Sequence, residues 1–235
     1  MKQIWKKPLA WLMTRSMMLS LMPAMATAAL AAESATNGLD FTSMETTDNS
    51  ANGWKWDKDN KALTLDNANI SISRGIQIGE PIDEIGIYLP EGATIVLNGT
   101  NTVTMTGSDS KINDLYAIRG SGDLSIIGNG TLNVTAQLAD SVTTNSIRVR
   151  GIYSRNLLTV GGNGDGPAIK VSAHDKGNRS DGVYGGSMYL LGGSIEADFG
   201  YTSGTTSYGV NAGKLLGIAN GFKITAKGEK SMDYA

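Results

Sequence analysis

The chain has 235 residues, with 20 Lys and Arg against 22 Asp and Glu, 30 glycines and no cysteine. The absence of cysteine excludes disulfide bonds and lipid attachment through a cysteine, so the fold must be held by its core alone. The mildly acidic balance disfavours nucleic acid and anionic membranes as partners, because both select for basic proteins. Many glycines and few aromatic residues, with little helical periodicity beyond the N-terminus, indicate an all-β protein with many turns.

Residues 1–32 have the pattern of a secretory signal peptide. Four basic residues, the last of them Arg15, lead into an apolar run over 17–25 and then into small-residue cleavage sites. The run is too short to span a bilayer, and Pro23 interrupts it. Removal of this segment leaves 16 basic against 22 acidic residues, a net charge of −6. We therefore expect a protein that is secreted or held at the extracellular cell surface, with no membrane insertion after cleavage.

The next part of the chain leads into the first repeat. Residues 33–52 are polar and rich in Ser, Thr and Asn, which predicts a flexible lead or the start of a cap. Trp54 and Trp56 follow on one side of an extended segment, where they would close the first end of a stack or, alternatively, offer a platform to a sugar. Alternating apolar residues over 62–72 predict two short strands, the second half of a coil, in a domain that covers residues 53–235.

A repeat of about 30 residues organises the rest of the chain. Its clearest copy, residues 117–136, has a small residue and an aliphatic one, a turn, alternating Leu and Ile, a glycine corner, and alternating Leu and Val. Similar copies start at Gly86, Gly151, Gly182 and Gly209. Each copy is too short to bury its own apolar face and must stack on its neighbours. The sequence therefore predicts a right-handed parallel β-helix, a solenoid of about six coils with three short strands per coil.

Aligned from their first residues, the copies give three apolar columns that should face the interior, because equivalent residues of stacked coils lie about 4.8 Å apart. The three columns are Ile87, Ile118, Ile152, Val183, Val210; Leu97, Ile126, Val160, Leu191, Ile218; and Val103, Leu132, Ile169, Ile195, Phe222. The register of residues 188–191 is ambiguous by one residue, and the choice decides whether Tyr189 or Leu190 faces the core.

An outward column two residues after each coil start holds the candidate carbohydrate-binding residues. It contains Tyr88, Arg119, Tyr153 and Tyr184 and ends at Asn211. Aromatic rings and a guanidinium in line would stack on sugar rings and pair with uronate carboxylates. The same pattern is typical of an exposed ladder in which flat side chains stack only on each other. The variable loops after the third strand of each coil are a second candidate binding side.

Three phrases of the sequence resemble those of a known family, at residues 54–57, 63–68 and 89–101. The family is that of secreted bacterial carbohydrate-binding domain-containing proteins with a pectate-lyase-like right-handed parallel β-helix. The resemblance covers about residues 53–235 and depends on repeat spacing and strand phrases. It implies attachment to plant or other acidic polysaccharide outside a Gram-positive cell, with calcium as a candidate cofactor. No catalytic motif of the family can be placed on this sequence.

An enzyme on this scaffold would be a polysaccharide lyase, with carboxylates around calcium and a basic residue, or a hydrolase with two facing carboxylates. Counted from the coil starts, the aspartates form no ladder, and Asp140 and Asp175 come closest to matching. The pattern favours solvated surface acids for these two, with a single shared calcium site as the alternative. His174, the one histidine of the chain, lies in a polar loop and is expected to face solvent. We therefore assign no catalytic and no metal-binding residue.

Together these patterns favour a secreted, non-catalytic carbohydrate-binding protein of the bacterial cell surface that recognises a polysaccharide through the outward column. The alternatives are a polysaccharide lyase or hydrolase and a structural adhesin stalk. The last repeat ends in phase with the start of another and shows no cap, which predicts either end-to-end self-association or further coils in a longer parent protein.

Overall fold

A computed structural model describes residues 37–143, 146–162, 164, 166–174, 179–201 and 207–230. Within them the chain is almost entirely β, apart from one short 3-10 segment, η1 (Ser50–Asn52). None of these described residues forms a helix of the length and hydropathy that membrane crossing requires. The predicted signal peptide, residues 1–32, lies outside the described residues.

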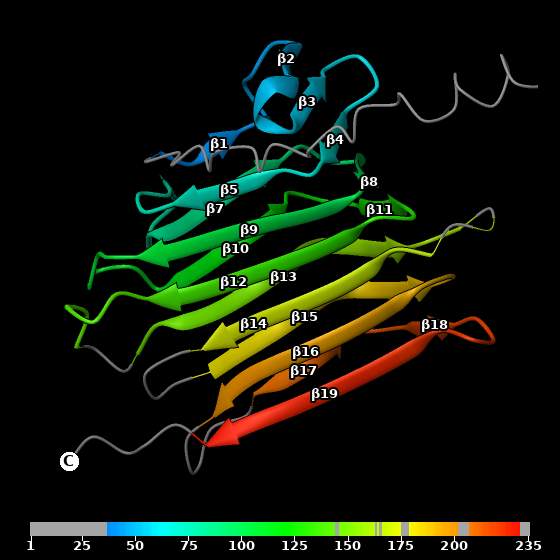
Figure 1. Ribbon diagram of the computed structural model, residues 1–235. Helices are drawn as coiled ribbons and strands as arrows, with labels where there is room; N and C mark the ends of the chain where they lie inside the picture. Colours follow the sequence, from blue (N-terminus) through cyan, green and yellow to red (C-terminus); the bar gives the residue numbers. More distant parts are fainter. Residues whose placement is uncertain are drawn as a thin grey trace, which may run out of the picture. The chain divides into compact units, whose positions relative to one another are not determined.

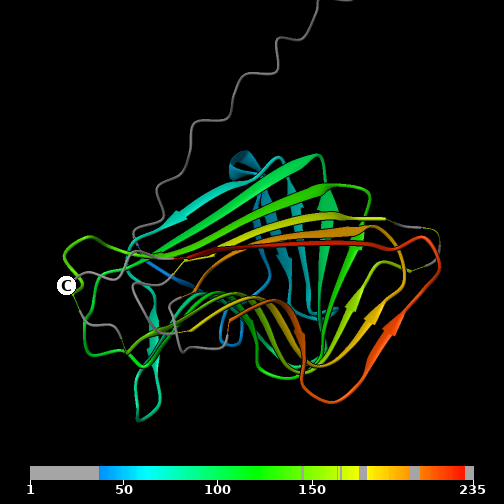
Figure 2. The same ribbon diagram turned by 90° about the horizontal axis from the view of Figure 1, so that it is seen from below.

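The strands stack as three parallel ladders around one core (Figure 1 and Figure 2). The first ladder contains β1 (Leu39–Asp40), β7 (Asp83–Leu89), β10 (Asp114–Gly120), the first part of β13 (Arg148–Val160), the first part of β15 (Arg179–Leu190) and β17 (Tyr208–Ala212). The second contains β4 (Ala62–Asp66), β8 (Ala93–Asn98), β11 (Leu124–Gly128), the remainders of β13 and β15, and β18 (Leu216–Ile218). The third contains β5 (Asn69–Ile72), β9 (Thr100–Gly107), β12 (Thr131–Leu138), β14 (Ala168–His174), β16 (Ser194–Tyr201) and β19 (Lys223–Lys230).

This arrangement confirms the predicted all-β solenoid of stacked parallel coils, with about five turns rather than six. The count of six included the opening half-coil of β4 and β5. That half-coil has no full strand in the first ladder, where only the two residues of β1 pair with β7.

Antiparallel pairing and buried aromatic rings mark the N-terminal end of the stack. The antiparallel strands are β2 (Thr47–Asn49) with β3 (Trp54–Asp57), β3 with β4, and β6 (Ile76–Ile78) with β7. Phe41 packs on Trp54 and Trp56 at ring-centroid distances of 5.6 and 5.0 Å, and all three side chains are buried. Because the two tryptophans are buried, neither presents a free ring face to a sugar.

The core confirms the first predicted column and corrects the second. Four residues of the first column are register partners without exposed surface: Ile87, Ile118, Ile152 and Val183. In the second column Ile126 pairs with Ile95, whereas Leu97 pairs with Gly128. Val160 pairs with Leu190, which is fully buried, while Leu191 is 48% exposed. Leu190 and not Tyr189 therefore faces the core.

The third column needs the same kind of correction. Leu132, Ile169 and Ile195 are aligned as predicted, and Ile224 rather than Phe222 continues them. Val103 lies two residues beyond the position that pairs with Leu132. The turns between strands differ in length, so counting from the coil start slips. A slip of two residues keeps the side chain on the inner face, whereas the slip of one at Leu191 turns it outward.

The strands of the first ladder bend inward at the coil starts, which Figure 2 shows on the lower side of the molecule. Residues 84–87 are buried one after another, so the alternation of inner and outer faces is broken there. The residue at the coil start must be small. A Cβ on Gly86, for example, would lie 2.8 Å from the carbonyl oxygen of Ala117. Side chains just before and two residues after the bend share one outer face, as the contact of Tyr116 with Arg119 demonstrates.

Candidate functional site

The predicted outward residues lie side by side on the outer face of the first ladder. Register pairs join Tyr88 to Arg119, Arg119 to Tyr153, and Tyr153 to Tyr184, and Asn211 pairs with Tyr184. All five are half-buried rather than fully exposed. We call Tyr88, Arg119, Tyr153 and Tyr184 the tyrosine–arginine column.

Arg119 already has partners within the protein. Its Nη1 donates to Asp83 Oδ2 at 2.7 Å, and its guanidinium lies 4.8 Å from the ring centroid of Tyr116 and 5.8 Å from that of Tyr153. Burial raises the pKa of Asp83, and the hydrogen bond from Arg119 opposes that rise. The positive charge of Arg119, which we expected to pair with a uronate, is therefore already paired with a carboxylate and lies between aromatic rings.

Two tyrosines of the column stack on each other. Tyr153 and Tyr184 are parallel, with ring centroids 5.0 Å apart and an interplanar angle of 9°. Tyr116 meets Tyr153 edge-on at 5.1 Å. On the far side of Tyr184, a Cβ on Gly213 would lie 2.9 Å from the tyrosine hydroxyl. Tyr153 and Tyr184 thus form a stacked pair within the column, and both side chains are half-buried.

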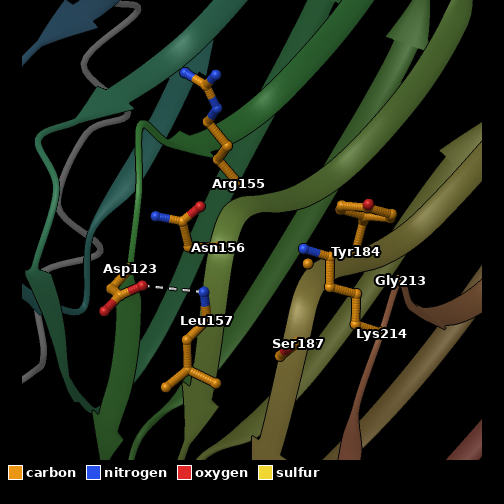
Figure 3. A pocket seen from close by; sticks show the side chains of 9 residues that line it. Asp123, Arg155, Asn156, Leu157, Tyr184, Ser187, Gly213 and Lys214 are labelled. Atoms are coloured by element: carbon orange, nitrogen blue, oxygen red, sulfur yellow. Dashed lines mark hydrogen bonds between the residues drawn. The ribbon is translucent and has the colours of Figure 1, made fainter.

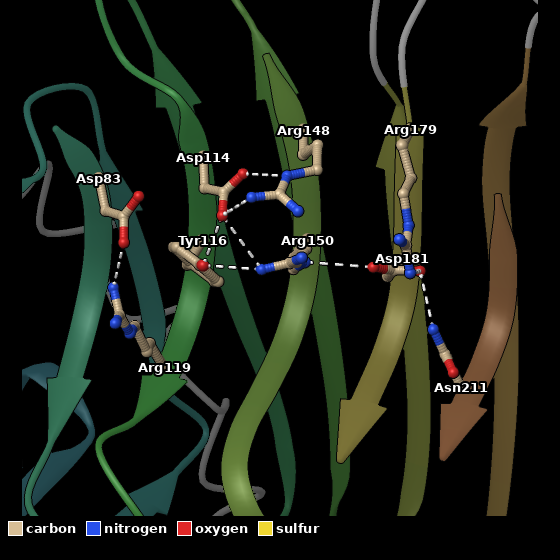
Figure 4. A network of polar contacts seen from close by, with 9 residues as sticks. All are labelled: Asp83, Asp114, Tyr116, Arg119, Arg148, Arg150, Arg179, Asp181 and Asn211. Carbon is tan, nitrogen blue, oxygen red and sulfur yellow. Dashed lines mark hydrogen bonds and ion pairs between the residues drawn. The ribbon is translucent and has the colours of Figure 1, made fainter. Parts of the chain in front are cut away.

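A buried ion-pair network adjoins the column on the same face (Figure 4). Arg150 is its centre: Nε donates to Asp181 Oδ2 at 3.1 Å, and Nη1 donates to Asp114 Oδ2 at 3.2 Å and to the Tyr116 hydroxyl at 2.7 Å. Arg148 donates twice to Asp114, at 2.5 and 2.9 Å. The side chains of Arg150 and Asp181 are 8% and 0% exposed. We call these five residues the Arg150 network.

The network holds fixed charges. Burial raises the pKa of Tyr116 well above its ordinary value, the charge of Arg150 opposes the rise, and the charge of Asp114 adds to it. Burial by itself would lower the pKa of Arg150, but Tyr116, Asp114 and Asp181 together raise it. Tyr116 is therefore neutral and Arg150 cationic at neutral pH, so neither exchanges a proton with a ligand under these conditions.

Sequence reasoning missed this network, since it searched the aspartates only for a carboxylate ladder and found none. Arg150 pairs in register with Asp181 and also binds Asp114 of the preceding coil, so the carboxylates bind arginine instead of a shared cation. The available signal was in the residues just before each coil start, at Tyr116, Arg150 and Asp181. Counting forward from the starts places these residues at the end of the preceding copy and hides their alignment.

A surface pocket of about 360 Å³ lies beside the C-terminal end of the column (Figure 3). It is lined by Asp123, Arg155, Asn156, Leu157, Tyr184, Gly186, Ser187, Gly213 and Lys214. The register of β13 against β15 shifts between Ser154 and Leu157, and this irregularity places Arg155 and Asn156 on the surface. Asp123 Oδ1 accepts the Leu157 N–H at 3.1 Å, which ties the irregular segment to the preceding coil. We call this hollow the Arg155 pocket.

The Arg155 pocket differs from the Arg150 network in having cations available to a ligand. Arg155 and Lys214 are both exposed, and neither side chain forms an ion pair or hydrogen bond with another described residue. With Asp123 as the only acidic side chain in the lining, the pocket carries a net positive charge. Two free cations next to a tyrosine suit an anionic, ring-shaped ligand.

The remaining candidates from the sequence are the histidine and the two aspartates considered for calcium. Asp175, one of the two aspartates considered for calcium, lies outside the described residues, so its position relative to Asp140 is not assigned. No three His, Asp or Glu side chains among the described residues are grouped so as to hold a metal ion. His174 is 36% exposed, and its Nε2 lies 3.5 Å from Asp198 Oδ2 in the next coil, so it is not as isolated as the sequence indicated.

Comparisons of the chain with protein-family models, with curated proteins and with solved structures found no match. The structure shows the β-solenoid that the resemblance implied. No family match supports the carbohydrate binding or the pectate-lyase-like relationship that the resemblance also implied.

Proposed function

We propose that this protein is a secreted, non-catalytic polysaccharide-binding β-solenoid of the bacterial cell surface, with its binding face on the first ladder. The observation that carries the proposal is the tyrosine–arginine column, which crosses four coils in register and ends at a pocket with two cations that have no partner among the described residues.

The spacing of this face suits an extended glycan. Adjacent coils lie about 4.8 Å apart, close to the length of one sugar unit. A chain lying along the solenoid axis would contact the column at every coil. Each contact alone is weak, and the affinity comes from their sum.

The column and the Arg155 pocket have different roles in this proposal. The ring faces of Tyr153 and Tyr184 are used in their own stack, so the column offers ring edges and hydroxyl groups to the sugar. Arg119 is paired with Asp83, so it does not recognise charge. Arg155 and Lys214 bind the acidic group of the polysaccharide by charge-assisted hydrogen bonds.

The test of the class of function is a glycan array probed with residues 33–235, with and without calcium, beside assays for unsaturated uronates and for new reducing ends. Binding of acidic polysaccharides without product formation supports the proposal. Unsaturated products identify a lyase, and new reducing ends identify a hydrolase. A folded protein that binds no glycan on the array contradicts the proposal and favours an adhesin stalk.

The Arg155 pocket supplies the sharper variant. We expect the double substitution Arg155→Ala, Lys214→Ala to weaken binding of an acidic polysaccharide at least about tenfold, the equivalent of about 1.4 kcal/mol. Isothermal titration calorimetry measures the loss. The melting temperature should stay unchanged, because both side chains are exposed and unpaired among the described residues.

Lys223→Ala with Lys227→Ala is the matched control, since it removes the same charge from exposed positions on the third ladder. Equal weakening by both double variants would mean that only net charge matters and that the pocket is not a site.

Tyr184→Phe keeps the stack on Tyr153 and removes the hydroxyl, so it tests the column with less risk to the fold than Tyr153→Ala.

A further inference from the structure

Glu84 occupies a position that belongs to the apolar core in the next coils. It pairs in register with Leu115, which is followed by Val149 and Ser180, and all four residues are buried. Glu84 itself is 2% exposed. A carboxylate at a position that takes Leu and Val elsewhere costs folding free energy unless its oxygens are satisfied.

Only one of its two oxygens is satisfied. Glu84 Oε1 accepts the Gly75 N–H at 2.9 Å, whereas Oε2 is buried and has no hydrogen-bond partner in the described part of the chain. Two nearby glycines leave room for this carboxylate, because neither carries a side chain. A Cβ on Gly75 would lie 2.6 Å from Glu84 Cγ, and one on Gly107 would lie 3.2 Å from Oε2.

The same carboxylate lines a pocket of about 630 Å³ between the β5–β6 connection and the loop after β9. The other lining residues are Arg74, Gly75, Gln77, Ser108, Asp109 and Ser110. Asp109 is held in place, because its Oδ2 accepts from Gln77 Nε2 at 3.1 Å and its Oδ1 from the Lys111 N–H at 2.8 Å. We call this hollow the Glu84 pocket.

The two carboxylates in the pocket, those of Glu84 and Asp109, favour a ligand that is a cation and donates hydrogen bonds. Burial raises the pKa of Glu84, and the negative charge of Asp109 raises it further. A ligand that brings positive charge between the two carboxylates removes this repulsion and supplies the missing donor to Oε2. A metal ion fits less well, because no third His, Asp or Glu side chain joins the two among the described residues.

We propose that the Glu84 pocket binds the primary ammonium group of an amino sugar. The ammonium donates to the Asp109 carboxylate and, once the Glu84 carboxylate turns toward the pocket, to Glu84 Oε2. The volume of the pocket accommodates a sugar ring, and its hydroxyl groups meet Ser108, Ser110 and the exposed Arg74 at the rim. This site shares no residue with the tyrosine–arginine column or the Arg155 pocket, so it does not depend on the function proposed above.

The experiment is an NMR titration of ¹⁵N-labelled residues 33–235 with glucosamine, N-acetylglucosamine and Nα-acetyl-lysine amide. N-acetylglucosamine has the same ring without the ammonium group, and the lysine derivative has the ammonium group without the ring. We expect glucosamine to shift the amide signals of Gly75 and residues 108–110 and to bind at least tenfold more tightly than either of the other two.

Glu84→Gln and Asp109→Asn should each weaken glucosamine binding at least tenfold. Asp109→Asn serves if the buried substitution at Glu84 impairs folding, because Asp109 is half-buried in a loop. Glu80→Gln removes an exposed carboxylate from the same hairpin and should leave binding unchanged. Equal binding of glucosamine and N-acetylglucosamine, tighter binding of the lysine derivative, or no shift with glucosamine would each overturn the proposal.

Discussion

At the scale of single residues, Arg150 decides the character of the outer face. It joins aspartates from the coils on either side of it, and its guanidinium lies 5.3, 5.1 and 5.7 Å from the rings of Tyr116, Tyr153 and Tyr184. One buried cation thus connects the ion pairs to the tyrosine stack. Two of these rings, Tyr153 and Tyr184, belong to the tyrosine–arginine column.

We expect Arg150→Ala to lower the free energy of unfolding by about 3–5 kcal/mol, because it leaves the buried carboxylate of Asp181 without its closest guanidinium. Denaturant unfolding measures the change. Arg155→Ala, at an exposed arginine five residues further on, should shift stability by less than about 0.5 kcal/mol. Similar losses for the two variants would show that the Arg150 network contributes nothing specific to the fold.

At the scale of elements, β15 shows how a strand changes ladders with a register shift of one residue. Its first part pairs with β17 and its last three residues pair with β18. Met188 and Leu190 face the core, whereas Tyr189 is 40% exposed between them. Val183 is buried before the turn, so the inner face changes from odd-numbered to even-numbered residues at the turn, and alternation resumes after it.

This register predicts opposite outcomes for two adjacent leucines. Leu190→Ala should destabilise the protein by about 2–5 kcal/mol, because it leaves a cavity among buried neighbours. Leu191→Ala should change stability by about 0.5 kcal/mol or less, since that side chain is 48% exposed. Thermal unfolding of both variants distinguishes the two positions, and a larger effect at Leu191 would require the strand to be shifted by one residue.

At the scale of the whole molecule, the two ends of the described stack differ. Buried Phe41, Trp54 and Trp56 lie at the N-terminal end. In the coil of β17 to β19, Leu216, Ile218 and Ile224 are 46%, 50% and 38% exposed. Their register partners in the preceding coil are the buried residues Met188, Leu190 and Ile195. The same core position is thus covered in one coil and open in the next.

We expect residues 33–235 to associate through this apolar surface, because it combines exposed core side chains with strand edges. Sedimentation velocity over a range of concentrations should show a rising sedimentation coefficient. Ile218→Lys places a charge in the middle of the surface and should restore the monomer without unfolding it, since the side chain is already half-exposed. A protein that stays monomeric at the highest concentration would refute the expectation.

The sequence by itself determined the solenoid and the outward column. Both depend on local periods, the alternation within strands and the repeat of about 30 residues, which can be read without knowledge of the turns. The small residue at each coil start placed Tyr88, Arg119, Tyr153 and Tyr184 two positions later in every copy, and the structure keeps them in one row.

Only the tertiary structure decided what surrounds that row. Turn lengths shift the second and third strands by one or two residues, so Leu190 rather than Leu191 enters the core. Stacking of the coils creates the Arg150 network from residues more than 30 positions apart. The inward bend then places this network on the same face as the residues that follow the coil starts. Glu84 shows the same limit, because its burial in a column of Leu115 and Val149 follows from stacking and not from its own neighbours in sequence.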